Sequence, residues 1–542
     1  MIVEIPKLFH PLLFSFFPTF YVYSQNIHVL IPTELLLPLL VISGGTIVGF
    51  FILEKILKNK IKTALIITLF LVLFFSYGHI YNILNDFSVE DFDLGKHRYL
   101  LIPFTAIFVS GIIYFLKTKR KLDNATKITN VMSVAIMLVI SMTVITNVLE
   151  GNFYGSQTLD EEKMLGMGTS QEFNPNDLFP NPSSKSIIDI QNMLRDNNLP
   201  DIYYIIPDEY GSYHALKEFF NYDNSDFINY LKQKGFFVNE KSFANYPRTI
   251  QSISSSLNME YLDKITEQVG VNSKSYHLLN EHLSDNKVMS NMKSRGYVIV
   301  NMGSMWGPNT GFAEADVNLC EFKQINSNSL MNELLLSSML GYVQERFTEQ
   351  GRRDAILCTF DELYTINEKI PKQKFVFAHI QLPHSPFVFG PNGEHVTPGI
   401  PLNSSKWDDR KAHVDQIKFA NKKLKILIDK LLESEEKPII ILQSDTGSLF
   451  TGDFSNLRQG DVFLPNESSI VTIRERLSNL NAIYIPDEKY DLFYDGMTPV
   501  NTFRIIENTV FNGDYLLLED KTYWSTKDAP HNYEDVTNHL LN

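Results

Sequence analysis

Residues 202–211 read IYYIIPDEYG, an apolar run that changes within one residue into two acidic side chains, a tyrosine and a glycine. Short runs rich in β-branched and aromatic residues, closed by turn residues, are typical of β-strands. Residues 439–447 read IIILQSDTG and have the same form, with Asp445 directly after the apolar run and its closing polar pair. Both stretches therefore predict a strand that delivers a carboxylate at its carboxyl end.

Around these two strands, short β-type runs alternate with stretches of helical periodicity. Further strands are predicted at 297–300, 374–381 and 481–485, and helices at 226–234, 249–262, 286–295, 330–347 and 409–432. This alternation predicts an α/β domain over residues 200–542, with a mostly parallel sheet and helices on both of its faces. Residues 151–199 are richer in Asn, Pro, Ser and Gly and predict a juxtamembrane linker.

The first 150 residues differ sharply from the rest and predict an α-helical membrane bundle. Four stretches, 35–53, 63–84, 99–116 and 128–149, are apolar and long enough to cross a hydrocarbon core about 30 Å thick at about 1.5 Å per residue. A fifth stretch, 8–23, is shorter and contains Pro11 and Pro18. We count it as a span, which gives about five, because no small-residue cleavage site follows it, as a signal peptide would require.

Charged loops set the expected orientation of the bundle. Lys55, Lys58, Lys60 and Lys62 occupy one loop, and a second basic cluster begins at Lys117. The loop between them is mainly acidic. Because Lys/Arg-rich short loops stay in the cytoplasm, residues 151–542 are expected on the extracytoplasmic side of the cell membrane.

Composition excludes several classes of function. Residues 151–542 carry 53 acidic and 36 basic residues, which argues against nucleic-acid binding. The predicted spans have no Asp, Glu, Lys or Arg in their apolar centres, so an ion-transport pathway is not indicated. The two cysteines, Cys320 and Cys358, do not have the spacing of a zinc knuckle. They are expected either to form a disulfide or to be free and buried.

Polar side chains gather where the predicted strands end. Asp208 and Asp445 each follow a strand, and His379 ends a third, with His384 in the sequence PHSPF shortly after it. Because ligands bind at the carboxyl ends of strands in such sheets, two carboxylates and two imidazoles could converge on a divalent cation. Each Asp alone is more typical of a turn or a helix N-cap, so the prediction depends on their combination.

These features resemble the alkaline phosphatase and sulfatase superfamily, in particular its membrane-anchored branch of lipoteichoic acid synthases and phosphoethanolamine transferases. The resemblance implies that Asp208, Thr249 and Asp445 bind one divalent ion, Mn²⁺, Mg²⁺, Zn²⁺ or Ca²⁺. It also implies that Thr249, in the sequence NYPRTIQS, is the nucleophile. Nearby hydroxyls leave this assignment open, namely those of Ser252, Ser254, Ser255 and Ser256.

Three further residues take roles from the same resemblance. His384 matches the histidine that contacts a phosphoryl oxygen or the leaving group. Trp306, in the sequence MGSMWG, matches the cleft wall and is a candidate substrate contact or a core residue. His379 is a candidate substrate contact or a packed strand residue.

One position departs from the pattern of the superfamily. A histidine is expected after Asp445, but Thr446 stands there. Three interpretations remain: His379, His384, Glu209 or water completes a weaker site; the site takes an oxygen-loving ion; or the domain is catalytically inactive. The Cys-x-Pro-x-Arg motif of true sulfatases is also missing, which favours phosphoryl over sulfuryl chemistry.

The sequence therefore predicts a membrane-bound hydrolase or transferase. Its substrate would be a phosphoryl-linked lipid headgroup or envelope glycan. The alternative is a degenerate sulfatase-like domain that binds envelope polymer or a protein partner.

Overall fold

A computed structural model describes residues 8–27, 30–86, 97–149, 199–309, 311–312, 314–320, 328–396, 409–451, 458–459, 462–463, 467–526 and 529–540. The chain divides into two compact units. The first, here called the membrane unit, contains Met1–Gly168 and Lys323–Thr348. The second, the α/β unit, contains Thr169–Phe322 and Glu349–Asn542. Apart from Leu199, the predicted linker lies outside the described residues.

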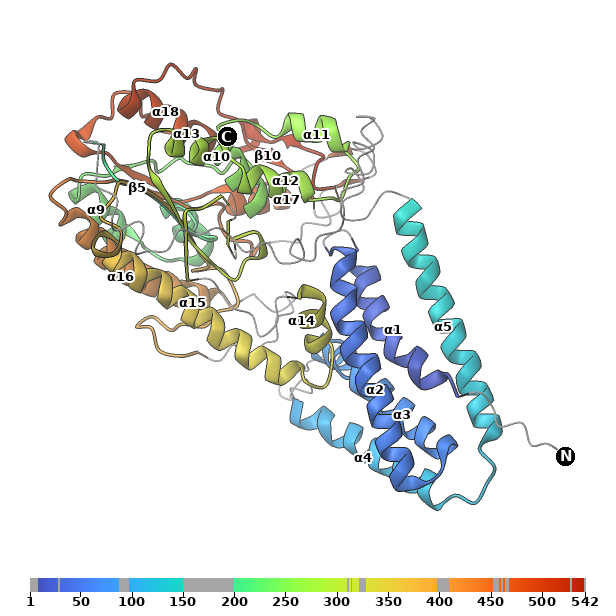
Figure 1. Ribbon diagram of the computed structural model, residues 1–542. Coiled ribbons are helices and arrows are strands. Elements are labelled where there is room, and N and C mark those ends of the chain that lie inside the picture. The colour runs from blue at the N-terminus through green and yellow to red at the C-terminus, as the bar shows by residue number, and fades with distance from the viewer. Residues whose placement is uncertain are drawn as a thin grey trace. The chain divides into compact units, whose positions relative to one another are not determined.

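The membrane unit consists mainly of helices (Figure 1, blue to cyan). They are α1 (His10–Gln25), η1 (Pro32–Leu35), α2 (Leu36–Leu57), α3 (Lys60–Asp86), α4 (His97–Lys117) and α5 (Asp123–Leu149). Among the described residues, four helical segments are long and apolar enough to cross a membrane, and they coincide with four predicted spans: Pro32–Leu57, Lys60–Tyr81, Tyr99–Lys117 and Asp123–Leu149.

Helix α1 coincides with the fifth predicted span. It has 16 residues, which gives a length of about 24 Å at about 1.5 Å per residue. That is shorter than a hydrocarbon core of about 30 Å. Whether α1 crosses the membrane therefore stays a prediction.

Large apolar side chains on these helices are exposed, as membrane helices require. Leu40 is 70% exposed, Met142 71% and Leu138 65%. Polar groups lie inside instead, where Nδ1 of buried His10 lies 2.6 Å from Oγ1 of Thr68. This distribution is the reverse of that in a soluble protein, and it fits a hydrocarbon surrounding.

A segment from the middle of the chain belongs to the membrane unit. Helix α14 (Ser329–Leu336) buries Leu330 and Leu334 against Val22, Tyr23 and Ile27. The backbone N–H of Leu330, in the first turn of α14, donates to Oε2 of Glu34 at 3.0 Å. Sequence patterns placed these residues within the α/β domain.

The turn after α14 bonds directly to the backbone of α3. Gly78 donates its N–H to the carbonyl of Ser337 at 3.1 Å, and Met339 donates to Phe74 at 2.9 Å. A Cβ atom at Gly78 would lie 2.5 Å from the Ser337 oxygen, so this approach requires glycine. The same turn interrupts the predicted helix 330–347, which in fact forms α14 and a separate helix, α15 (Gly341–Lys369).

The α/β unit is built on a seven-stranded sheet of order β2-β9-β6-β1-β5-β3-β4. Its strands are β1 (Ile202–Pro207), β2 (Phe237–Val238), β3 (Val298–Met302), β4 (Val317–Leu319), β5 (Lys374–Ile380), β6 (Ile439–Gln443) and β9 (Asn481–Tyr484). The five strands from β6 to β4 are parallel, whereas β9 pairs antiparallel with both β6 and β2. The prediction of a mostly parallel sheet is confirmed.

Helices and short elements complete this unit (Figure 1). The helices are α8 (Tyr213–Phe220), α9 (Ser225–Gln233), α10 (Thr249–Asn258), α11 (Asp263–Val269), α12 (His277–Ser284), α13 (Lys287–Ser294), α16 (Arg410–Leu432), α17 (Glu467–Leu477), α18 (Pro499–Phe511) and α19 (Thr537–Leu540). The short elements are η3 (Gly307–Asn309), η6 (Pro486–Glu488), β7 (Arg458–Gln459), β8 (Val462–Phe463), β10 (Tyr523–Trp524) and β11 (Glu534–Asp535).

Successive residues of β1 enter two different hydrophobic cores. Tyr203 and Ile205 belong to one cluster, and Tyr204 and Ile206 belong to the other. Side chains of a strand alternate between faces, so a strand that is apolar throughout must be covered on both sides. This explains why the central strands read as continuous apolar runs.

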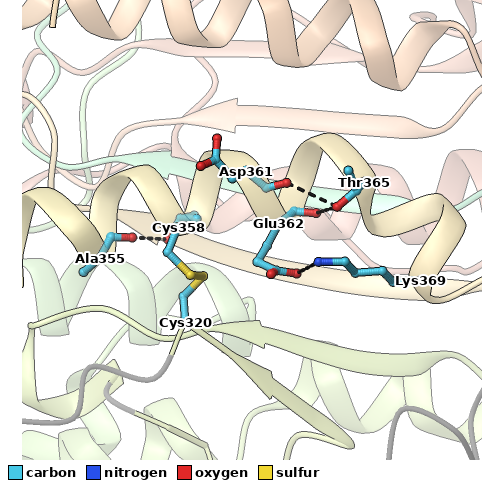
Figure 2. Close-up of a disulfide and its surroundings, with 8 residues drawn as sticks. Cys320, Ala355, Cys358, Asp361, Glu362, Thr365 and Lys369 are labelled. Atoms are coloured by element: carbon cyan, nitrogen blue, oxygen red, sulfur yellow. Dashed lines mark hydrogen bonds and ion pairs between the residues drawn. A yellow bond between two sulfur atoms is a disulfide. The ribbon is translucent and has the colours of Figure 1, made fainter.

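Cys320 and Cys358 form a disulfide in the α/β unit (Figure 2). Cys320 follows β4, and Cys358 lies on α15. The bridge closes a loop with a sequence separation of 38. That loop contains the segment that packs in the membrane unit. The disulfide therefore joins the two ends of the loop covalently, and both ends lie in the α/β unit.

Candidate metal centre

Three adjacent parallel strands bring the candidate ligands together. Asp208 follows β1, His379 lies near the end of β5, and Asp445 lies just beyond β6. In the sheet register, Ile206 is opposite His379 and Ile205 is opposite Leu442. All three residues are therefore delivered to the same edge of the sheet, where ligands gather in α/β folds.

The three side chains form a compact, buried group. Ligand atoms of Asp208, His379 and Asp445 all lie within 4.8 Å of one another. Nε2 of His379 is 3.4 Å from Oδ2 of Asp208. Oδ1 of Asp208 and Oδ2 of Asp445 are buried and have no hydrogen-bond partner among the described residues. Buried acceptors without donors are rare in folded proteins and indicate that another group, such as a cation, completes the site.

The pKa shifts of Asp208 and His379 also indicate a site for a cation. Burial, followed by the negative charges of Asp445 and Glu209, raises the pKa of Asp208 well above its ordinary value. Arg352 and Arg476 oppose this rise. Burial lowers the pKa of His379 to about 4, so its imidazole is neutral and able to act as a ligand. A divalent cation would replace the proton that Asp208 otherwise favours.

His379 lies beside the two aspartates, whereas Thr446 stands where the superfamily pattern has a histidine. The sequence suggested a packed strand residue or a substrate contact for His379, and offered it as one of several groups able to complete the site. In the structure it is the imidazole that joins the two aspartates. Thr446 is fully buried, and its hydroxyl has no hydrogen-bond partner among the described residues.

Glu209 links the ends of β1 and β6. It has a φ of 61°, in the left-handed region that a residue with a side chain rarely adopts. In this conformation its N–H donates to Oδ1 of Asp445 at 3.1 Å. Its own carboxylate accepts from Arg476 and lies 3.7 Å from Nε2 of His384. Glu209 thus faces basic groups rather than the aspartates.

Thr249 is the first residue of α10, which places its hydroxyl at a helix N-terminus. One turn further along, Ser252 donates its hydroxyl to the carbonyl of Asp445 at 2.7 Å. This bond brings the first turn of α10 beside the loop that carries Asp445. A helix N-terminus attracts anions, so a phosphoryl group would be favoured there.

The neighbouring serines of α10 have other partners. Each hydroxyl donates to a backbone carbonyl and is buried: Ser252 to Asp445, Ser254 to Leu279, Ser255 to Glu260 and Ser256 to Ser252. Thr249 alone among the five candidate nucleophiles is only half-buried. This accessibility favours Thr249 over the serines.

Several solved structures of other proteins are similar to this chain. No family model matches the sequence, and no curated protein matches it. The C-terminal periplasmic domain of EcEptC from Escherichia coli, in complex with Zn, has 12% identity and a TM-score of 0.41, over 63% of this chain and 93% of that chain. Lipooligosaccharide phosphoethanolamine transferase A of Neisseria meningitidis, an integral membrane protein, has 10% identity and a TM-score of 0.35, over 92% and 95% of the two chains.

A third similar structure is a protein of the alkaline phosphatase superfamily from Vibrio parahaemolyticus. It has 12% identity and a TM-score of 0.34, over 66% of this chain and 79% of that chain. The superfamily that the sequence motifs resemble is thus represented among the similar structures.

The other predicted residues lie around the three ligands. Trp306 contacts His379, with ring centroids 5.0 Å apart in an edge-on arrangement. The side chain of His384 is part-buried, and its backbone N–H donates to the carbonyl of Asp208 at 3.1 Å. Trp306 therefore packs edge-on against a candidate ligand, and His384 lies at the same edge of the sheet.

Two buried arginines were not identified from the sequence. Arg352, on α15, donates to the carbonyls of Gln381 and His384 at 3.0 and 2.8 Å. Arg476, near the end of α17, pairs with Glu209. A buried acidic group signals the need for a countercharge, but no local pattern shows which basic residue supplies it. Only the fold brings these arginines to the site.

Proposed function

We propose that this chain is a membrane-bound enzyme that transfers or hydrolyses a phosphoryl-linked group, with a divalent cation held by Asp208, His379 and Asp445. One observation carries the proposal: a buried group of two carboxylates and one neutral imidazole, with carboxylate oxygens that lack donors among the described residues. Such a mixed oxygen and nitrogen set suits Zn²⁺ or Mn²⁺. The cation would supply positive charge that lowers the pKa of a bound hydroxyl and neutralises charge on phosphorus.

Thr249 is the proposed nucleophile. Its Oγ attacks phosphorus in line with the leaving oxygen, so that an O–P bond forms as the bond to the leaving group breaks. The Thr249 hydroxyl proton passes to solvent water. His384, part-buried at the same edge, takes up a proton from solvent and gives it to the leaving oxygen, or it contacts a phosphoryl oxygen while water protonates the leaving group. Water or an acceptor hydroxyl then attacks the phosphorylated Thr249 and regenerates it.

A lipid headgroup or an envelope glycan is the proposed class of substrate. The apolar helices hold the chain at a membrane, where such a substrate lies. The disulfide supports an extracytoplasmic α/β unit, because disulfides persist in oxidising compartments. The basic loops of the bundle indicate the same side.

Substitution of Thr249 tests the proposal in the full-length, detergent-solubilised protein. Turnover of a chromogenic phosphodiester is measured with Mn²⁺ for wild type, Thr249→Ala and Thr249→Ser. We expect Thr249→Ala to lose at least a hundredfold in kcat and Thr249→Ser to keep part of it. Ser255→Ala is the control, since Ser255 lies on the same helix and its hydroxyl donates to the backbone carbonyl of Glu260, beyond the end of α10.

Two results would contradict the proposal. Undiminished turnover in Thr249→Ala would exclude this nucleophile. Tight Mn²⁺ binding by wild type without turnover of phosphodiesters or phospholipids would favour the alternative, in which the domain binds an envelope polymer or a protein and does no chemistry.

A further inference from the structure

Arg476 bonds to three separate loops of the candidate centre. Its Nε donates to the carbonyl of Pro247 at 2.8 Å. Its Nη1 donates to Oε1 of Glu209 at 2.5 Å and to the carbonyl of Gly447 at 2.9 Å. The side chain is only 9% exposed. One guanidinium therefore holds three chain segments that are far apart in the sequence.

Each of these segments carries a proposed functional residue close to the point of contact. Glu209 follows Asp208, Pro247 lies two residues before Thr249, and Gly447 lies two residues after Asp445. Gly447 also donates its N–H to the carbonyl of Arg476 at 2.7 Å. Arg476 and Gly447 thus each donate a hydrogen bond to the other. Together with the bonds to Glu209 and Pro247, these bonds restrict the relative positions of the three loops.

Gly447 shows how close this packing is. A Cβ atom at this position would lie 2.3 Å from the carbonyl oxygen of Glu475 and 2.6 Å from that of Ser478. The loop after Asp445 can therefore approach the end of α17 only because residue 447 is glycine. Helix α17 carries none of the proposed metal ligands or the nucleophile. Its C-terminal end packs against the loop that carries Asp445.

We propose that Arg476 is the positioning residue that holds the Asp208, Thr249 and Asp445 loops at the spacing needed to bind the cation and to present the hydroxyl. This inference rests on the proposed function. A guanidinium suits the task because it is planar and offers several donors in fixed directions. A lysine would keep the charge but could not serve the same three acceptors in one geometry.

The matched control lies on the same helix. Arg474 is two residues earlier and pairs with Glu218, and these side chains are 37% and 48% exposed. Its guanidinium lies against the carboxylate of Glu218 and the ring of Phe219. Arg474→Ala therefore removes the same type of side chain from α17 at a site away from the three loops. Its effect on the centre should be small.

The test uses full-length protein and Mn²⁺ as the probe. Calorimetric titration gives the Mn²⁺ affinity of wild type, Arg476→Ala, Arg476→Lys and Arg474→Ala, and thermal unfolding in EDTA checks that each is folded. We expect Arg476→Ala to bind Mn²⁺ at least tenfold more weakly, which equals about 1.4 kcal/mol. Arg476→Lys should lose a smaller factor, and Arg474→Ala should stay within twofold of wild type. Added methylguanidinium should restore part of the affinity to Arg476→Ala only.

The outcomes separate this inference from the proposed function. A folded Arg476→Ala protein with wild-type Mn²⁺ affinity overturns the positioning role and leaves the metal centre intact. A wild type that binds no Mn²⁺ overturns the metal centre and this inference with it. Where Arg476→Ala does not fold, Arg476→Lys decides: weaker binding supports the inference, and unchanged binding overturns it.

Discussion

Nε2 of His379 lies 3.4 Å from Oδ2 of Asp208, and both side chains are buried at the ends of neighbouring strands. This pair, with Asp445 beside it, places two carboxyl groups and an imidazole in one buried group. We expect this arrangement to destabilise the metal-free protein and to favour binding of a cation. Both the stability of the metal-free protein and its affinity for Mn²⁺ can be measured.

Asp208→Asn should stabilise the protein in the absence of metal. The substitution removes a buried carboxylate whose pKa is raised by burial and by Asp445 and Glu209, so the charge is unfavourable there. We expect the thermal unfolding midpoint in EDTA to rise by about 2–4 °C, the effect of about 1 kcal/mol in a large domain. The same variant should lose the rise that Mn²⁺ gives to wild type. A lower midpoint in EDTA would show that Asp208 is already satisfied without metal.

Paired substitutions can show whether His379 or Thr446 contributes to Mn²⁺ binding. His379→Ala should weaken Mn²⁺ binding at least tenfold, because it removes one of the three proposed ligands. Thr446→Val keeps the shape of a buried side chain whose hydroxyl lacks a partner among the described residues. It should leave the affinity within twofold and leave stability unchanged or slightly higher. Calorimetry that ranks the two variants in the opposite order would make Thr446 the ligand.

Gly78→Ala should disturb the segment that packs against α3. The new Cβ would meet the Ser337 carbonyl at 2.5 Å, which costs about 1–3 kcal/mol or moves the segment away. Gly49→Ala is the control, since Gly49 lies in α2 with no atom within 4 Å of an added Cβ. Limited proteolysis around 337–340 should become faster in Gly78→Ala only. Equal rates in both variants would argue against this docking.

Loss of the disulfide should destabilise the protein. Closing the loop between Cys320 and Cys358, which are 38 positions apart, is worth on the order of 3–4 kcal/mol in the chain-entropy model. We expect Cys320→Ser/Cys358→Ser to unfold at lower denaturant concentration than oxidised wild type, and reductant to shift wild type alone. An identical midpoint in all samples would mean that the bridge does not form in solution.

Much of the architecture could be predicted from local patterns. Apolar stretches of membrane length predicted four helices that the structure contains, because burial in lipid demands long uncharged runs. The strands ending at Asp208 and Asp445 were predicted from apolar runs closed by turn residues, and the helix 409–432 from its periodicity. In each case the pattern that predicts the helix or strand is carried by residues that are close together in the sequence.

Other features depended on contacts between residues distant in the sequence. The pairing of β1 with β5 places His379 beside the two aspartates, and the end of α17 places Arg476 against three loops. The sequence placed the predicted helix 330–347 in the α/β domain, yet α14 and the turn after it pack in the membrane unit, where Gly78 leaves room for the Ser337 carbonyl.

The sequence by itself determined that a membrane bundle precedes a parallel α/β sheet and that carboxylates stand at strand ends, since hydrophobic periodicity and turn chemistry are local properties. Only the tertiary structure decided which imidazole joins those carboxylates and which arginine holds their loops. Those choices depend on strand order and register, through which residues far apart in the chain are brought within hydrogen-bond distance.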